Sequence, residues 1–151
     1  MRVTLAAVGR WKRGPLPQVF EDYRTRLSWP LTLKEVSARK PLAGDRLKTH
    51  EAELLSAALP QPARLVTLDA GGTALCSEAF ARWLGAWEDD GVAEVGFVIG
   101  GSEGLDPALL RRADLTLSLG PMTWPHLLVR VLLAEQLYRA QAIRQGHPYH
   151  K

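Results

Sequence analysis

The sequence contains a single cysteine, Cys76, among its 151 residues, so the chain cannot form an internal disulfide. Proteins without disulfides are typical of reducing compartments, and we expect a cytoplasmic location. No apolar run reaches the length of about 18 residues that a membrane-spanning helix needs, so no membrane partner is expected. The start, Met1-Arg2-Val3-Thr4-Leu5, has the pattern of a strand and lacks the parts of a signal peptide.

Two common phosphate-binding motifs and a metal-binding pattern are also missing. No G-x-x-x-x-G-K-[ST] is present, which excludes a P-loop. The glycine run from Gly100 to Gly104 does not fit G-x-G-x-x-G, and it follows the fourth predicted strand instead of the first. His147 and His150 have no second cluster of Cys or His near them in the sequence, so no metal site is expected.

The residues that are present alternate between strand and helix patterns. Apolar runs predict five strands, over residues 2–8, 31–36, 64–68, 94–99 and 115–119. Helical spacing predicts five helices, over residues 17–27, 45–59, 77–88, 107–113 and 125–145. This order predicts an α/β fold, with a Rossmann-like, mostly parallel five-stranded sheet and helices on both faces. No linker divides the chain, so residues 1–151 are expected to form one domain.

Two helix starts carry capping signals. Ser77 is expected to cap the third helix, and Glu78 to help its first turn. Asp106 followed by Pro107 is the pattern of an N-cap with proline at the first helical position.

Glycine-containing segments follow three of the predicted strands, at 69–72, 100–104 and 120–123. In open parallel sheets, ligands bind beyond the carboxyl ends of the strands. Glycine lets the backbone approach a ligand closely, and Leu, Pro and Met can supply an apolar slot for an adenosine ring. The three segments therefore predict a ligand pocket, although glycine turns of this kind also occur as ordinary α/β loops.

Positive charge is concentrated in two places, with a net charge of +3 overall. Arg10, Lys12 and Arg13 follow the first predicted strand, and a second group, with two histidines and a tyrosine, lies at the C-terminus. Such groups favour a polyanionic partner, but they also fit two solvated surfaces. The C-terminal segment likewise fits a tail that is merely docked on the surface.

The last predicted helix has apolar residues over an unusually wide arc. A helix of this kind packs on two sides, either within a monomer or against its own sheet and a partner subunit. The residues concerned are Leu127, Leu128, Val131, Leu132, Leu137, Tyr138 and Ile143.

The C-terminal third carries several runs that are specific in combination. They are Phe97 to Leu105, Leu117 to Leu119, Met122-Thr123, Pro125-His126, Leu128 to Val131, Glu135 to Ala140 and His147 to Lys151. Together with the turn from Leu68 to Gly72, they resemble the SPOUT superfamily, and within it the bacterial ribosomal RNA large-subunit pseudouridine N3-methyltransferases. The sequence departs from that family at Ser102, where proline is common, and at Gly120 and Pro121, one of which is usually bulkier.

The resemblance implies properties that the residue patterns alone do not reveal. It implies a C-terminal deep trefoil knot, S-adenosylmethionine as cofactor and a homodimer formed through the last helix. The implied substrate is a pseudouridine in a stem-loop of 23S rRNA, at the subunit interface of the assembled ribosome, and not DNA.

The resemblance also assigns residues to the site. Arg139, Tyr149 and His150 are expected at the substrate, with His150 as the candidate base because histidine titrates near neutral pH. The tail of one subunit is expected near the cofactor of the other. The expected cofactor residues are Leu68, Gly100, Gly104, Leu119, Gly120, Pro121, Met122, Thr123 and Trp124.

Two alternatives remain open at the level of sequence. A non-catalytic RNA-binding dimer would keep the basic groups and the wide last helix, but would not need the glycine turns and the His/Tyr tail together. A nucleotide-dependent enzyme of another class would also use a Rossmann-like sheet, although its dinucleotide fingerprint is missing.

Overall fold

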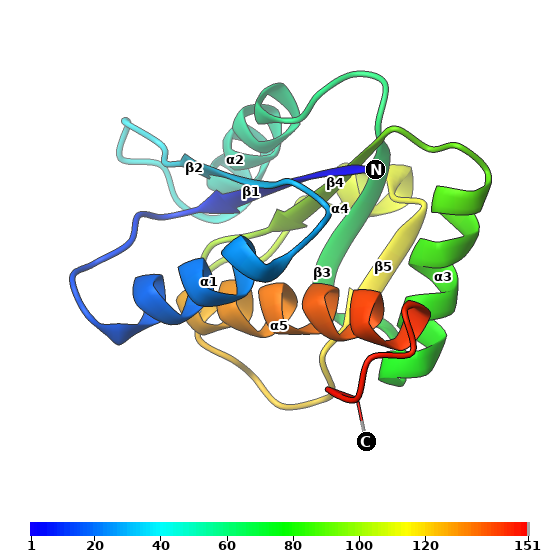
Figure 1. Ribbon diagram of the computed structural model, residues 1–151. Coiled ribbons are helices and arrows are strands. Elements are labelled where there is room, and N and C mark those ends of the chain that lie inside the picture. Colours follow the sequence, from blue (N-terminus) through cyan, green and yellow to red (C-terminus); the bar gives the residue numbers. More distant parts are fainter. Residues whose placement is uncertain (151) are drawn as a thin grey trace.

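The computed structural model describes residues 1–150, so Lys151, the last residue of the tail motif, lies outside the described part (Figure 1). The strands are β1 (Arg2–Val8), β2 (Leu31–Val36), β3 (Arg64–Ala74), β4 (Glu94–Ile99) and β5 (Leu115–Ser118). The helices are α1 (Pro15–Arg26), α2 (Gly44–Ala58), α3 (Ser77–Asp89), α4 (Pro107–Arg112) and α5 (His126–Arg144). No helix in residues 1–150 combines the length and apolar character that crossing a membrane requires.

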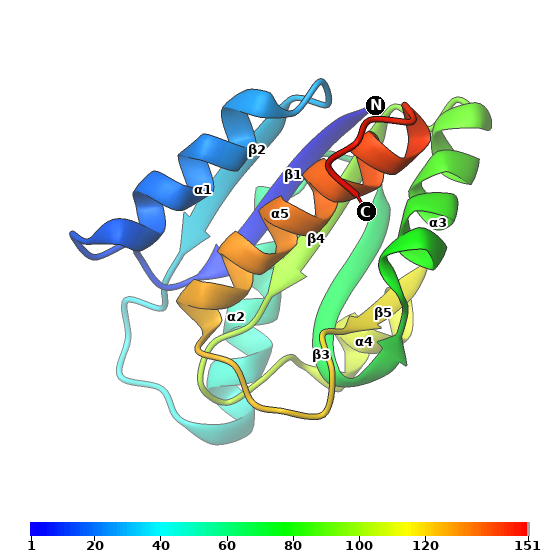
Figure 2. The ribbon, with the colours of Figure 1, turned by 60° about the horizontal axis from the view of Figure 1, so that its bottom comes forward.

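All five strands form one sheet, in the order β2-β1-β4-β3-β5, and every neighbouring pair is parallel. Helices α1, α3 and α5 lie on one face, and α2 and α4 lie on the other (Figure 2). Each face has its own apolar core, with Phe20, Phe80 and Leu137 in the larger one and Leu55 and Leu109 in the smaller. The predicted α/β sheet with helices on both faces is therefore confirmed.

Strand β3 is longer than the sequence predicts, and the expected turn after Leu68 is wrong. The strand continues through 69–72, and pairing with β5 resumes at Thr73 after an irregularity. A Cβ on Gly72 would lie 2.5 Å from the carbonyl oxygen of Thr116 in β5. Glycine therefore permits two strands to approach closely here, instead of reversing the chain.

One of the two predicted helix caps is also wrong. Cys76, not Ser77, is the N-cap residue of α3, and its side chain makes no capping hydrogen bond. The Ser77 hydroxyl is instead engaged with Oε1 of Gln136 on α5, at 2.7 Å, so it links two helices. Asp106 does cap α4 as expected, since its Oδ1 accepts the amide of Ala108 at 2.7 Å.

A buried arginine fixes the start of α5 against the ends of β1 and β2. The Arg130 side chain is fully buried, and its Nη1 donates to Oε1 of Glu35 at 2.7 Å. Its Nη2 donates to the carbonyl oxygens of Val8 and Gly9, both at 2.9 Å. The guanidinium carbon lies 4.8 Å from the ring centroid of Trp11. One side chain thus joins α5 to three segments of the N-terminal half.

Gly9 is the residue that makes this approach possible. Its φ of +92° favours glycine, and a Cβ there would lie 3.2 Å from Nε2 of His126 and 3.7 Å from Nη2 of Arg130. The first turn of α5 therefore packs directly on the backbone at the end of β1.

Replacing Arg130 by methionine should lower the free energy of unfolding by about 3 kcal/mol, because Glu35 loses its partner charge and two buried carbonyls lose their donor. Thermal unfolding should then occur roughly 6–12 °C lower. Arg82→Met removes an exposed arginine from α3 and serves as the control, with an expected change within about 0.5 kcal/mol. Equal melting temperatures for the two variants would contradict the anchoring role of Arg130.

Candidate functional site

A pocket of about 180 Å³ opens at the carboxyl ends of β3, β4 and β5. The loops after these strands and the first turn of α5 form its wall. Of the nine expected cofactor residues, eight line this pocket: Leu68, Gly100, Gly104, Leu119, Gly120, Met122, Thr123 and Trp124. Pro121 is not among the lining residues. The chain thus gathers residues from three separate predicted loops around one cavity.

The turn after β4 is built by glycine. The amide of Gly104 donates to the carbonyl of Gly101 at 3.1 Å, and Gly104 has a φ of +81°, which favours glycine. A Cβ on Gly100 would lie 3.0 Å from Cδ2 of Leu105 and 3.1 Å from the backbone of Gly104. The turn therefore needs Gly100 for its own closure, whether or not a ligand binds.

The pocket combines apolar walls with backbone polar groups. Leu68, Ile99, Leu117, Leu119 and Val129 provide the apolar part. Gly100, Gly101, Gly104 and Gly120 also line the pocket, and glycine has only backbone amide and carbonyl groups to offer the polar edge of a heterocyclic base. This pattern suits a flat, partly apolar ligand such as a nucleoside.

The glycine turn also reads as Gly-x-Ser-x-Gly, which is the pattern of a hydrolase nucleophile. Ser102 is exposed, however, and within residues 1–150 no hydrogen bond joins its hydroxyl to a histidine. The turn therefore lacks the base that would activate a serine.

His126 is a pocket residue that the sequence reasoning did not assign to the site. It lies in the first turn of α5 and lines the cavity beside Gly9. Burial and the nearby Arg130 guanidinium lower the pKa of its imidazole, which favours the neutral form. The only signal in the sequence was its place in the Pro125-His126 pair.

Glu51, on α2, is a second residue that the sequence did not reveal. Its side chain is buried directly beneath Gly101, and its Oε2 has no hydrogen-bond partner within the described residues. Burial, and then the negative charge of Glu103, raise the pKa of this carboxyl group. The glycine turn thus rests on a side chain for which loss of its proton is costly.

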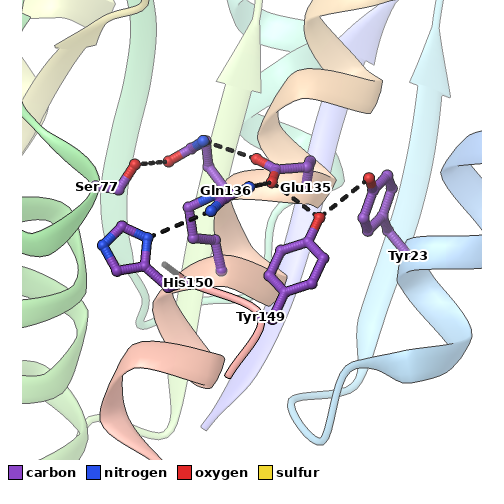
Figure 3. A network of polar contacts seen from close by, with 7 residues as sticks. Tyr23, Ser77, Glu135, Gln136, Tyr149 and His150 are labelled. Atoms are coloured by element: carbon purple, nitrogen blue, oxygen red, sulfur yellow. Dashed lines mark hydrogen bonds and ion pairs between the residues drawn. The ribbon is translucent and has the colours of Figure 1, made fainter. Parts of the chain in front are cut away.

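The three expected catalytic residues contact one another in a polar network, in which Tyr149 and His150 lie near Glu135 (Figure 3). Arg139, on α5, donates to Oε1 of Glu135 through Nε at 2.9 Å, and its Nη1 lies 3.3 Å from Nδ1 of His150. The hydroxyl of Tyr149 donates to the same Glu135 oxygen at 3.1 Å and lies 3.3 Å from the hydroxyl of Tyr23. The tail is therefore folded back on α5.

The contacts of His150 define its tautomer. Because arginine has only donors, Nδ1 of His150 must accept from Arg139. Nε2 then carries the proton and donates to Oε1 of Glu78, at 3.0 Å. The backbone amide at Glu78, and then His150, lower the pKa of the Glu78 carboxyl to about 2, so this acceptor is ionised at neutral pH. Both nitrogens of His150 are thus occupied in the single chain.

Tyr149 is held as a protonated phenol. Burial raises its pKa, and so do its hydrogen bonds with Tyr23 and Glu135. Tyr149 therefore serves as a hydrogen-bond donor near neutral pH.

A second cavity, of about 610 Å³, lies between the tail network and the pocket. It is lined by Glu78, Glu135 and Gln136 on one side, and it shares Leu119 and Trp124 with the pocket. None of the tail residues that the structure describes, 147–150, lines the pocket itself. Within one chain, the expected catalytic and cofactor residues are adjacent groups and do not form a single site.

Comparison with known proteins gives full-length matches. The family described as "Predicted SPOUT methyltransferase" matches residues 1–150. A protein of Rhodospirillum centenum named ribosomal RNA large subunit methyltransferase H is 62% identical over 100% of this chain and 99% of its own length. A protein of the same name from Paramagnetospirillum magneticum is 54% identical, with the same coverage of both chains.

Solved structures share the fold at low sequence identity. A methylase-family protein of Haemophilus influenzae is 11% identical, with a TM-score of 0.59 over 95% of this chain. A methyltransferase of Legionella pneumophila, solved with bound SAM, is 12% identical, with a TM-score of 0.50 over 93% of this chain. This chain covers 66% of each of those two. From the match over residues 1–150 and the full-length relatives, the chain belongs to the SPOUT methyltransferase family.

Proposed function

We propose that this protein transfers a methyl group from S-adenosylmethionine to N3 of a pseudouridine in a 23S rRNA stem-loop, at the subunit interface of the assembled ribosome. The observation that carries the proposal is the pocket at the ends of β3, β4 and β5, in a chain 62% identical to a ribosomal RNA large subunit methyltransferase. Because ribosomes are the substrate, the protein would act in the cytoplasm, with residues 1–151 as one methyltransferase domain.

The residues of the pocket fit S-adenosylmethionine. Leu68, Leu117 and Leu119 would enclose the adenine ring, and the backbone of the turns after β4 and β5 would bind its polar edge. Beyond Gly104 the space is open, because a Cβ there would meet no atom within 4 Å. The cofactor supplies an electrophilic methyl group on its sulfonium, so no further activation of that group is required.

The protein's own task is then to prepare the nucleophile. N3 of pseudouridine is an imide nitrogen between two carbonyls, and it must lose its proton to attack the methyl group. His150 is the proposed base, and Arg139 would stabilise the negative charge on the carbonyl oxygens. Tyr149, which keeps its proton, would donate a hydrogen bond to the base or stack on it.

The site would be completed by a second subunit. In the single chain Arg139 occupies the lone pair that His150 needs in order to accept a proton, and residues 147–150 of the tail do not line the pocket. Homodimerisation through α5 would bring the tail of one subunit to the cofactor of the other. In support, Leu132 on α5 and Trp124 border the second cavity, and Trp124 and Met122 are among the exposed large apolar residues.

The chain path near the pocket is compatible with a deep trefoil knot. After β5, at one edge of the sheet, residues 119–125 cross past the turn after β4 and reach the end of β1, where α5 begins (Figure 2). In the proposed knot, the C-terminal segment that contains α5 would thread through a loop formed by the preceding part of the chain. The knot would hold the walls of the pocket in one arrangement.

Filling the pocket should weaken cofactor binding without removing any polar group. Val129→Phe places a larger apolar side chain in the 180 Å³ cavity, and we expect the Kd for S-adenosylmethionine to rise by more than about tenfold, measured by calorimetry. This variant is preferable to a change at Gly100, which would also strain the turn. Val19→Phe, on the exposed face of α1, is the control. An unchanged Kd for Val129→Phe would show that the cofactor does not bind in this pocket.

The substrate is tested by offering the purified protein assembled ribosomes, separate large subunits and free 23S rRNA. We expect one methyl group per assembled ribosome, located by mass spectrometry on N3 of a pseudouridine, with much slower transfer to free rRNA. Methylation at carbon or ribose, or at a site outside the subunit interface, would refute the assignment. S-adenosylmethionine binding without any transfer would favour a non-catalytic RNA-binding dimer.

Mixing two variants with complementary defects should show whether the tail acts on the partner subunit. His150→Ala removes the proposed base, and we expect it to slow transfer by about 10²–10⁴-fold while cofactor binding is retained. Val129→Phe retains the tail but binds the cofactor weakly, so transfer is measured at an S-adenosylmethionine concentration well below the Kd of this variant. If the tail acts in trans, a co-expressed mixture contains heterodimers with one complete site and recovers about a quarter of the wild-type activity. No recovery from a mixture verified to contain heterodimers would place the tail in the site of its own subunit.

A further inference from the structure

The loops after β1 and β2 carry positive charge that no other part of the described chain neutralises. Arg10, Lys12 and Arg13 lie in residues 9–14, and Arg39 and Lys40 lie in residues 37–43. Neither loop contains an acidic residue. All five side chains are exposed, and within residues 1–150 none of them forms an ion pair or a side-chain hydrogen bond. We call these five residues the basic rim.

The basic rim lies at the carboxyl ends of the strands, as the cofactor pocket does. Strands β1 and β2 are parallel neighbours whose register ends at Val8 opposite Val36, and the amide of Gly9 donates to the carbonyl of Val36 at 2.8 Å. The two loops therefore leave the sheet together. Gly9 also touches His126, which lines the pocket, so the rim begins directly beside the pocket wall.

The first of these loops is fixed by its aromatic residue. The backbone amide of Trp11 donates to Oε1 of Glu35 at 2.6 Å, and the Trp11 ring packs against Phe20 and the guanidinium of Arg130. Arg10 and Lys12 thus flank an anchored residue, which keeps like charges close together despite their repulsion. Because the Trp11 ring is already engaged in the protein, the loop offers no free apolar side chain for insertion into a membrane.

We propose that the basic rim binds the phosphate backbone of the RNA substrate next to the nucleotide that is methylated. The proposal rests on the proposed function and adds to it the surface that holds the RNA. Unpaired arginine and lysine side chains beside a site that modifies a base supply the positive charge that binds the phosphates of a nucleic-acid backbone. Such contacts provide affinity and orientation without reading the base sequence, which agrees with a substrate recognised by its place in a large assembly.

Three double variants that each remove two positive charges test this surface. Lys12→Gln with Arg13→Gln, and Arg39→Gln with Lys40→Gln, alter the basic rim. Arg111→Gln with Arg112→Gln is the matched control. Both arginines are exposed in the last turn of α4, and neither forms an ion pair in the part of the chain that the structure describes. All three should keep the wild-type melting temperature and the wild-type Kd for S-adenosylmethionine.

Methyl transfer to ribosomes is then measured at several salt concentrations. For each rim variant we expect KM for ribosomes to rise roughly fivefold to tenfold with little change in kcat. The slope of log KM against log salt should become shallower by about 1.4–1.8, which corresponds to two lost phosphate contacts. The control variant should match the wild type in both quantities.

The outcomes separate this proposal from the proposed function. Rim variants with the wild-type KM and salt slope would overturn the basic rim as an RNA surface, and so would an equal change in all three variants, which would reflect net charge alone. If the wild type itself transfers no methyl group to ribosomes, the proposed function fails, and the rim is tested by fluorescence anisotropy with a labelled RNA stem-loop. Weaker binding of that RNA by the rim variants alone would support the rim, and equal binding by all variants would overturn it.

Discussion

The hydrogen bonds of Arg130 to the ends of β1 and β2 are the contacts on which the site depends. A buried guanidinium is costly unless its donors are matched. Glu35 and two backbone carbonyls accept from Nη1 and Nη2 of Arg130, while its Nε has no hydrogen-bond partner within the described residues. Because this side chain fixes the first turn of α5 at Gly9, residues 119–125 must cross the ends of the central strands to reach it. The same crossing brings Met122 and Thr123 opposite the glycine turn, which creates the pocket.

Much of the fold followed from local patterns in the sequence. The five apolar runs marked the strands, and the glycine segments after them marked the edge where a ligand would bind, because both signals are local. The predicted turn after Leu68 was wrong, because the glycine there has a different structural role. At Gly72 it allows β3 to approach β5 closely, and a glycine that ends a strand cannot be distinguished in sequence from one that lets two strands meet. The prediction that Ser77 caps α3 was wrong for a similar reason, since its hydroxyl is hydrogen-bonded to a residue of α5.

The residues whose roles the sequence did not reveal are those that depend on contacts with distant parts of the chain. Arg130 interrupts an apolar helix and reads as a solvated charge, yet its partner Glu35 lies 95 positions away in the chain. Glu51 also reads as an ordinary polar residue on the face of an amphipathic helix. Only the folded chain places it beneath Gly101, where water cannot reach one of its oxygens. Periodicity reports which face of a helix is apolar, but not which polar residue is covered by a loop from elsewhere.

The cations of the basic rim and those of the C-terminal network have different environments. This difference assigns RNA binding to the rim and catalysis to the C-terminal network. Arg139 is committed to Glu135, whose hydrogen bond raises the pKa of the guanidinium, and His150 is held between Arg139 and Glu78. These groups cannot attract RNA from a distance, because carboxylates beside them cancel their field. Within residues 1–150 the cations of the basic rim form no ion pair, so the long-range attraction for a polyanion comes mainly from them. In the proposed complex, the rim therefore supplies affinity for the RNA. The tail contacts the pseudouridine only after its contacts within the protein are replaced by contacts with the substrate.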